Sequence, residues 1–240
     1  MSKITRLKQM LRQVGLYNLA KDEYELKDEK MSNLDYLELL ITKEIQMREQ
    51  KNIYKRKKAS ALPEKNFDDF DIEQAKGINK WQIDKLTTLE FLEEQTNIII
   101  IGSAGVGKTH VASSIGNIAV KKGAKTIYVT MLNLLKAITL RDKKSEKLLT
   151  YIKECQLVII DEFGYTKLNE TESQQTYHYL TNLNRTKSLV IITNKDLNNI
   201  PEMFSEKLLA NTLIDRLTEN SQLIYLTGLS YRQRNHNKIF

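Results

Sequence analysis

The chain has 240 residues, 41% of them hydrophobic, with a formal net charge of +7 and a single cysteine, Cys155. This length suits one ordinary domain with a modest appendage, and a lone cysteine, most simply a small buried residue, excludes a disulfide scaffold. No apolar run approaches the roughly 20 residues of a membrane helix, and no signal-type segment opens the chain, so we expect a cytoplasmic protein without membrane contact.

Two helical patterns fill the first sixty residues. Apolar residues recur at helical spacing from Ile4 to Val14 and again from Leu34 to Ile45, which predicts a small helical domain over residues 1–62. The second pattern runs into six basic residues that face a single acid, Glu49; they are Arg48, Lys51, Lys55, Arg56, Lys57 and Lys58. Both a solvated helix end and a patch that contacts DNA phosphates fit this composition.

The next segment, NFDDFDIEQ from Asn66 to Gln74, is acidic and aromatic and has no clear period. We interpret it as a connector into a second domain that covers residues 63–240. Its two phenylalanines, Phe67 and Phe70, either anchor the core or touch the base of a nucleotide.

From Ile98 onward, short apolar runs alternate with helical patterns. Continuous β-branched runs are typical of strands that are buried on both faces, and their alternation with helices predicts a parallel sheet. The expected fold is therefore an α/β three-layer sandwich around a parallel five-stranded sheet. The predicted strands are Ile98–Ile101, Thr126–Thr130, Leu157–Ile160, Leu189–Thr193 and Leu223–Leu226.

The loop after the first strand, GSAGVGKT, fits the phosphate-loop pattern G-x-x-x-x-G-K-[ST] at every fixed position. Its glycines let successive backbone N–H groups point inward, and the helix that follows presents a positive N-terminal dipole. Lys108 supplies charge to the β- and γ-phosphates, and Thr109 offers a hydroxyl to Mg²⁺. The predicted ATP-binding residues are Gly102, Ser103, Ala104, Gly105, Val106, Gly107, Lys108, Thr109 and His110.

Two acids end the strand in LVIIDEFG, residues 157–164. Asp161 is the candidate ligand of Mg²⁺ together with Thr109, and Glu162 is the candidate general base for the water that attacks the γ-phosphate. The alternative is an acidic pair that merely faces solvent at a strand end.

Two further polar residues follow later apolar elements. Asn194 ends the strand in LVIITNK, at the edge where ligands of open α/β sheets lie, and could position the attacking water. Arg216, in LIDRLTEN, could reach the γ-phosphate of a neighbouring subunit, because a guanidinium matches phosphate geometry. Alternatively, Thr-Asn is a simple turn, and Arg216 pairs on its helix with Asp215 or Glu219.

Taken together, these motifs and GLSYRQR at residues 228–234 resemble the AAA+ branch that contains the helicase loaders DnaC and DnaI and the transposition helper IstB. The N-terminal layout is similar to that of IstB-like proteins. The resemblance implies an ATPase that assembles on duplex DNA, without base readout, and helps a cognate transposase. It also implies that Lys108, Glu162 and Asn194 act in catalysis, with Arg216 as a finger in trans within a homo-oligomer.

The same resemblance places Arg232 where a second sensor arginine binds the nucleotide, with a tail arginine that touches DNA as the alternative. Only a minimal C-terminal lid, or none, is expected. A DnaC-like loader of a replicative helicase is the nearest rival function. A P-loop kinase is less well supported, because no arginine-rich lid segment follows residue 109, and a third alternative is a DNA-binding scaffold that binds ATP without hydrolysing it.

Overall fold

The computed structural model describes residues 2–21, 31–140, 142–228 and 230–231. Arg232 and the expected minimal lid lie outside the described residues. The chain divides into two compact units, Met1–Lys55 and Arg56–Phe240. The predicted domain boundary at residue 62 stays a prediction. None of the described helices is long and apolar enough to cross a membrane.

The first unit contains α1 (Lys3–Gln13) and most of α2 (Asn33–Ser60). Ser2 caps α1, because its hydroxyl accepts a hydrogen bond from the Thr5 backbone N–H at 3.2 Å. Both predicted helices form, but most of the apolar side chains that predicted them are exposed, among them Leu7 at 45% and Ile41 at 43%. The apolar spacing therefore predicts the helices without predicting a core inside this unit.

A buried carboxylate, Glu44 on α2, holds the first unit together. It is 1% exposed and accepts hydrogen bonds from the Asn18 backbone at 3.0 Å, the Leu19 backbone at 2.9 Å and the Arg48 Nε at 2.7 Å. Burial raises the pKa of Glu44, but the hydrogen bonds from Leu19, Arg48 and Asn18 together hold it below its ordinary value of 4.5. The segment after α1 is thus fixed to α2 through charge-assisted hydrogen bonds.

The second unit begins with the connector. A short 3-10 turn, η1 (Phe67–Asp69), precedes α3 (Lys80–Thr88) and α4 (Glu90–Glu93). A reciprocal capping box starts α3, in which Asn79 and Gln82 each accept from the other's backbone N–H. Phe70 is 6% exposed and packs in the core, and it also lines the cavity at the phosphate loop, so both interpretations of the connector stay open.

Five parallel strands form one sheet in the order β2-β3-β4-β1-β5. In the β1–β4 pair, Ile98 lies opposite Val190, and in the β2–β3 pair, Thr130 lies opposite Asp161. Each predicted strand is confirmed, with shifts of a residue or two at some ends. The strands are β1 (Asn97–Gly102), β2 (Thr126–Thr130), β3 (Leu157–Asp161), β4 (Ser188–Thr193) and β5 (Ser221–Leu226).

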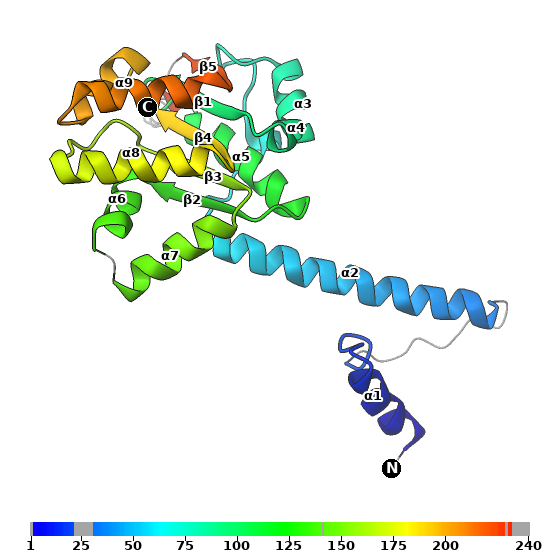
Figure 1. Ribbon diagram of the computed structural model, residues 1–240. Helices are drawn as coiled ribbons and strands as arrows, with labels where there is room; N and C mark the ends of the chain where they lie inside the picture. The colour runs from blue at the N-terminus through cyan, green and yellow to red at the C-terminus, as the bar shows by residue number, and fades with distance from the viewer. Residues whose placement is uncertain (1, 22–30, 141, 229, 232–240) are drawn as a thin grey trace, which may run out of the picture. The chain divides into compact units, whose positions relative to one another are not determined.

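Helices cover both faces of this sheet (Figure 1), as the three-layer prediction requires. Alternate residues of each central strand enter opposite cores: Ile99 packs with α6, α7, α8 and α9, whereas Ile100 packs with α3, α4 and α5. Both cores consist mainly of buried aliphatic side chains, so the sheet is a rigid base for the loops at its edge. The remaining elements are α5 (Lys108–Lys121), α6 (Met131–Leu140), α7 (Lys143–Glu154), α8 (Glu170–Asn184), η2 (Leu197–Met203) and α9 (Lys207–Glu219).

Candidate functional site

A cavity of about 790 Å³ lies at the carboxyl ends of β1, β3 and β4, where parallel sheets place their ligand sites. The connector, the phosphate loop, the ends of β2, β3 and β4, and the C-terminal segment all line it. Most of the predicted catalytic and nucleotide-contacting residues meet here. They are Ala104, Gly105, Gly107, Lys108, Thr109, His110, Asp161, Glu162 and Asn194.

The phosphate loop takes a conformation that its glycines make possible. Gly105 and Gly107 have φ angles of +83° and +101°, values that side chains rarely tolerate. A Cβ at Gly107 would also lie 2.9 Å from the Phe70 ring. Immediately afterwards α5 begins at Lys108, so the N-terminal end of the helix lies at the cavity, where its positive dipole favours an anion.

Within the loop, each predicted side chain has a definite place. The Lys108 ammonium donates to the Ser103 carbonyl at 2.7 Å, so the side chain lies over the phosphate loop. A bound phosphate would attract the ammonium away from this carbonyl. His110 contacts the Asn66 carbonyl through Nε2 at 2.7 Å, which ties the loop to the connector. Val106 is 2% exposed and packs in the core, so only its backbone is available to a phosphate.

The candidate metal ligands lie side by side. Thr109 donates its hydroxyl to Asp161 Oδ2 at 2.9 Å, and Asp161 Oδ1 accepts from the Glu162 backbone N–H at 2.6 Å. One hydroxyl and one carboxylate beside a phosphate loop suit Mg²⁺, which binds few protein oxygens and keeps water and substrate phosphates as its other ligands. The residues present therefore fit the metal that the motif implies.

A third donor to Asp161 is absent from the sequence prediction. The Tyr128 hydroxyl, on β2, donates to Asp161 Oδ2 at 2.6 Å. Burial, and then the hydrogen bond to the Asp161 carboxylate, raise the pKa of Tyr128 above its ordinary value, so the hydroxyl keeps its proton. The available signal was a tyrosine in a strand next to the acidic strand end, but its use requires the β2–β3 register.

Glu162 and Asn194 both leave the strands toward the cavity. Glu162 is exposed and has a φ angle of +59°, an unfavourable conformation for a residue with a side chain and one that is frequent at functional sites. The hydrogen bond from the Phe163 N–H to the Ile192 carbonyl, at 2.9 Å, fixes the backbone just after it. Asn194 is exposed directly after β4, on the neighbouring strand.

Arg216 does not line this cavity. It is exposed on α9, and its guanidinium carbon lies 5.5 Å from the centre of the Tyr177 ring on α8. The expected alternative was an ion pair with Asp215 or Glu219; the contact that the structure shows is instead the ring of Tyr177. Arg216, the predicted finger residue, is therefore exposed and lies outside the nucleotide cavity of its own chain.

The C-terminal segment closes one side of the phosphate loop. The Tyr231 N–H donates to the Gly105 carbonyl and its hydroxyl donates to the Asp71 carbonyl, both at 3.0 Å. The sequence marks Ser-Tyr-Arg at residues 230–232 as a motif but assigns a role only to Arg232. Tyr231 is the member of that motif that the structure places in the cavity wall.

The family model described as IstB-like ATP binding protein matches residues 5–239. A protein of Bacillus thuringiensis subsp. berliner, named as an ATP-binding protein of insertion sequence IS232, is 33% identical over 235 residues, which cover 96% of this chain and 92% of the relative.

Solved structures support the same fold. The crystal structure of DnaI has a TM-score of 0.57 at 19% identity and covers 68% of this chain and 92% of its own. That of the DnaC helicase loader has a TM-score of 0.52 at 22% identity and covers 68% and 96%. These likenesses confirm the predicted fold, an α/β sandwich around a parallel five-stranded sheet, and its resemblance to DnaI and DnaC.

Proposed function

The chain belongs to the family of IstB-like ATP-binding proteins, and from that premise we propose that it is an ATPase that assembles on duplex DNA and recruits a transposase. The observation that carries the ATPase assignment is the convergence of Lys108, Thr109, Asp161, Glu162 and Asn194 on one cavity. These residues come from three separate motifs, and each has a distinct task in phosphoryl transfer to water.

In this proposal, backbone N–H groups of residues 104–109 hold the phosphates and Lys108 moves from the Ser103 carbonyl to the β- and γ-phosphate oxygens. Thr109 and Asp161 hold Mg²⁺, which neutralises phosphate charge when bound. Glu162 accepts the proton of the attacking water, and Asn194 orients that water by a hydrogen bond from its amide. The fixed backbone around Glu162 keeps its carboxylate at the cavity.

Arg216 completes the site of an adjacent subunit. Its exposed position on α9, away from the cavity of its own chain, supports action in trans. The Tyr177 ring holds the guanidinium by a cation–π contact without neutralising it. Because hydrolysis then needs two subunits, turnover is coupled to oligomer formation, and DNA that gathers subunits stimulates both.

Duplex DNA is the proposed polyanion, bound through its phosphates. The net charge of +7 and the basic end of α2 support this step. Arg48, Lys51 and Lys57 already have partners within the chain: Arg48 bonds Glu44 and the Gly15 carbonyl, Lys51 bonds Asn18, and Lys57 bonds Glu64. Arg56 is partly buried. We therefore assign phosphate contact mainly to the exposed Lys55 and Lys58.

The first test measures ATP binding and phosphate release separately. Lys108→Ala should abolish the binding of a fluorescent ATP analogue in a folded protein. Glu162→Gln should bind the analogue and DNA but lose hydrolysis by about 10²-fold or more, since only the general base is removed. The exposed acid Glu170, which does not line the cavity, provides the matched control Glu170→Gln. Unchanged hydrolysis in Glu162→Gln would remove Glu162 from the mechanism.

A helicase loader is the second candidate, because the DnaI and DnaC folds match the ATPase unit. It uses the same nucleotide chemistry, so ATPase assays do not separate the two. The partner does: purified transposase and purified replicative helicase should be compared for complex formation with the full chain. Binding of the helicase alone would favour the loader.

A further inference from the structure

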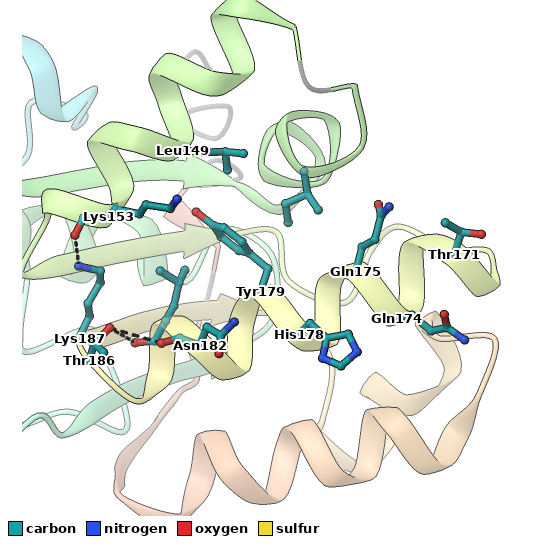
Figure 2. Close-up of a pocket in the computed structure, with 12 residues that line it drawn as sticks. Leu149, Lys153, Thr171, Gln174, Gln175, His178, Tyr179, Asn182, Thr186 and Lys187 are labelled. Carbon is teal, nitrogen blue, oxygen red and sulfur yellow. Dashed lines mark hydrogen bonds between the residues drawn. The ribbon is translucent and has the colours of Figure 1, made fainter.

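A second cavity, of about 870 Å³, lies in the groove between α7 and α8 (Figure 2). Its apolar side is formed by Ile138, Leu149 and Leu183, and the ring of Tyr179 rises from α8 toward Leu149 and Lys153. None of its lining residues lines the nucleotide cavity. The proposed ATPase function therefore leaves this groove unexplained.

Two polar atoms in the groove wall have no hydrogen-bond partner among the described residues. They are the Tyr179 hydroxyl oxygen and the Gln175 Oε1, and both are buried. Burial, with a smaller effect from Cys155, raises the pKa of Tyr179 to about 12, so the hydroxyl remains a donor at neutral pH. Because buried polar groups are nearly always paired in native proteins, a molecule that enters the groove and bonds both atoms, once the two side chains turn toward it, would remove a defect of the unbound protein.

The groove also has a definite charge. Lys153, Lys187 and His178 line it, and none of the described lining residues is acidic. Lys187 donates to the carbonyls of Lys153 and Cys155, at 2.6 and 2.7 Å, and so is already committed. The Lys153 ammonium has no ion-pair partner within the part of the chain that the structure describes, and it lies next to Tyr179 (Figure 2). An occupant with a carboxylate is complementary to this end.

We propose that the α7–α8 groove binds a peptide segment of another protein in which a bulky apolar side chain stands next to a carboxylate. The apolar side chain enters between Ile138, Leu149 and Leu183, and the carboxylate meets Lys153. A peptide backbone offers one N–H donor and one carbonyl acceptor per residue, which are the groups that Gln175 and Tyr179 lack. The cavity volume is within the usual range for ligand sites that are mostly apolar with a few placed polar groups.

Three fluorescein-labelled peptides test this chemistry on the full chain by fluorescence anisotropy. The first has the core Glu-Leu-Phe-Glu, the second replaces both glutamates by lysines, and the third replaces Leu and Phe by serines. The first should bind about tenfold more tightly than either of the others, since it alone supplies both the apolar and the anionic part. Equal binding of all three, or no binding of the first, overturns the proposal.

Variants then locate the site. Lys153→Glu should abolish the preference for the acidic peptide and transfer it to the lysine peptide. Lys147→Glu makes the same charge change on the same helix outside the groove and should leave the preference unchanged. Tyr179→Phe should weaken the first peptide several-fold while the melting temperature stays equal or rises, because the removed hydroxyl has no partner in the unbound chain. A preference that survives Lys153→Glu overturns the assignment.

Two parallel measurements separate this proposal from its alternatives. ATP hydrolysis, measured on the same samples, should be unchanged in Lys153→Glu and Tyr179→Phe; peptide binding by a protein that lacks ATPase activity would refute the proposed function alone. Sedimentation reports self-association. If Lys153→Glu dissociates an oligomer and the peptides do not bind, the groove is a contact between copies of this chain and the proposal is overturned.

Discussion

Asp161 receives three hydrogen bonds before any ligand arrives. Thr109 and Tyr128 both donate to Oδ2, and the Glu162 backbone donates to Oδ1. The oxygens of a carboxylate that is 8% exposed need such donors because they have lost water, and the donors also fix the orientation of the carboxylate. The site therefore presents its oxygens to Mg²⁺ in a fixed position, so little reorganisation is needed on binding.

Tyr128→Phe tests how much of that orientation comes from the tyrosine. The ring stays in place and one donor is removed, which costs about 0.5–1.5 kcal/mol for a typical hydrogen bond. We expect the Mg²⁺ concentration for half-maximal binding of a fluorescent ATP analogue to rise up to about tenfold. Tyr165→Phe, which removes a hydroxyl from the same cavity, should not move it. An unchanged Mg²⁺ midpoint in Tyr128→Phe would show that its hydroxyl does not support the metal site.

Among single residues, the sequence predicts the site residues at the carboxyl ends of strands. It misses those that reach the site from a neighbouring strand or from a distant segment of the chain. Asp161, Glu162 and Asn194 could be placed because parallel strands align their carboxyl ends. Tyr128 and Tyr231 could not, because Tyr128 depends on the register of β2 against β3, and Tyr231 on the return of the chain past Gly105. Neither pairing has a local sequence signal.

Among the elements, α2 shows that a correctly predicted helix can bury a face other than its apolar one. Its apolar positions, such as Leu37 and Ile41, predict a helix correctly but are exposed, whereas Glu44, for which the sequence makes no prediction, is buried. Apolar spacing predicts secondary structure but does not show which face a partner or a buried ion will occupy. The interior of the first unit was for that reason not predictable.

Glu44 gives the first unit a pH dependence. Its pKa is lower in the folded chain than its ordinary value of 4.5, so the stabilisation is fully present above about pH 4.5 and is lost as the pH falls through the folded pKa. The protection factors of the Asn18 and Leu19 amides in hydrogen exchange, taken relative to the intrinsic rate at each pH, should therefore fall below about pH 4.5. Glu44→Gln should lower both protection factors already at pH 7, by an amount that corresponds to about 1–3 kcal/mol, and flatten their pH dependence. Protection of both amides that ignores pH would contradict this role.

At the basic end of α2, we expect Lys55 and Lys58 to make most of the proposed contacts with DNA phosphates. The double variant Lys55→Ala, Lys58→Ala should weaken binding to unrelated duplexes equally. It should also reduce the log–log salt slope by up to about 0.9 for each DNA phosphate that is no longer neutralised. Lys57→Ala is the matched control, because its ammonium pairs with Glu64 at 2.8 Å, and it should change the slope less. A double variant with unchanged slope would make this end of α2 a solvated surface.

For the whole molecule, the arrangement of the ATPase unit was predictable. Short apolar runs rich in β-branched residues predict the strands, and the helical segments between them predict crossover connections between parallel strands. What joins one subunit to the next was not predictable, since a single sequence carries no interface geometry. Arg216 illustrates the difference: its motif suggested a finger, and the structure adds that it is exposed and lies over Tyr177 instead of in its own cavity. Its proposed partner is another copy.

Mixing two inactive variants tests that proposal. Arg216→Ala should bind ATP nearly normally as a monomer but lose turnover by about 10³-fold or more, because the cavity is intact and the neighbour's site lacks its finger. Lys108→Ala loses its own nucleotide but keeps Arg216. In an equal mixture that assembles at random, about a quarter of the heterologous interfaces join an intact nucleotide site to an intact finger. Phosphate release should then recover to a corresponding fraction of the native rate, although neither variant is active alone.

The control mixes Arg216→Ala with the double variant Lys108→Ala, Arg216→Ala, which supplies no finger and should recover nothing. If the two single variants demonstrably assemble together on DNA and turnover still does not return, Arg216 acts within its own subunit through Tyr177, and the ATP site is not shared between subunits.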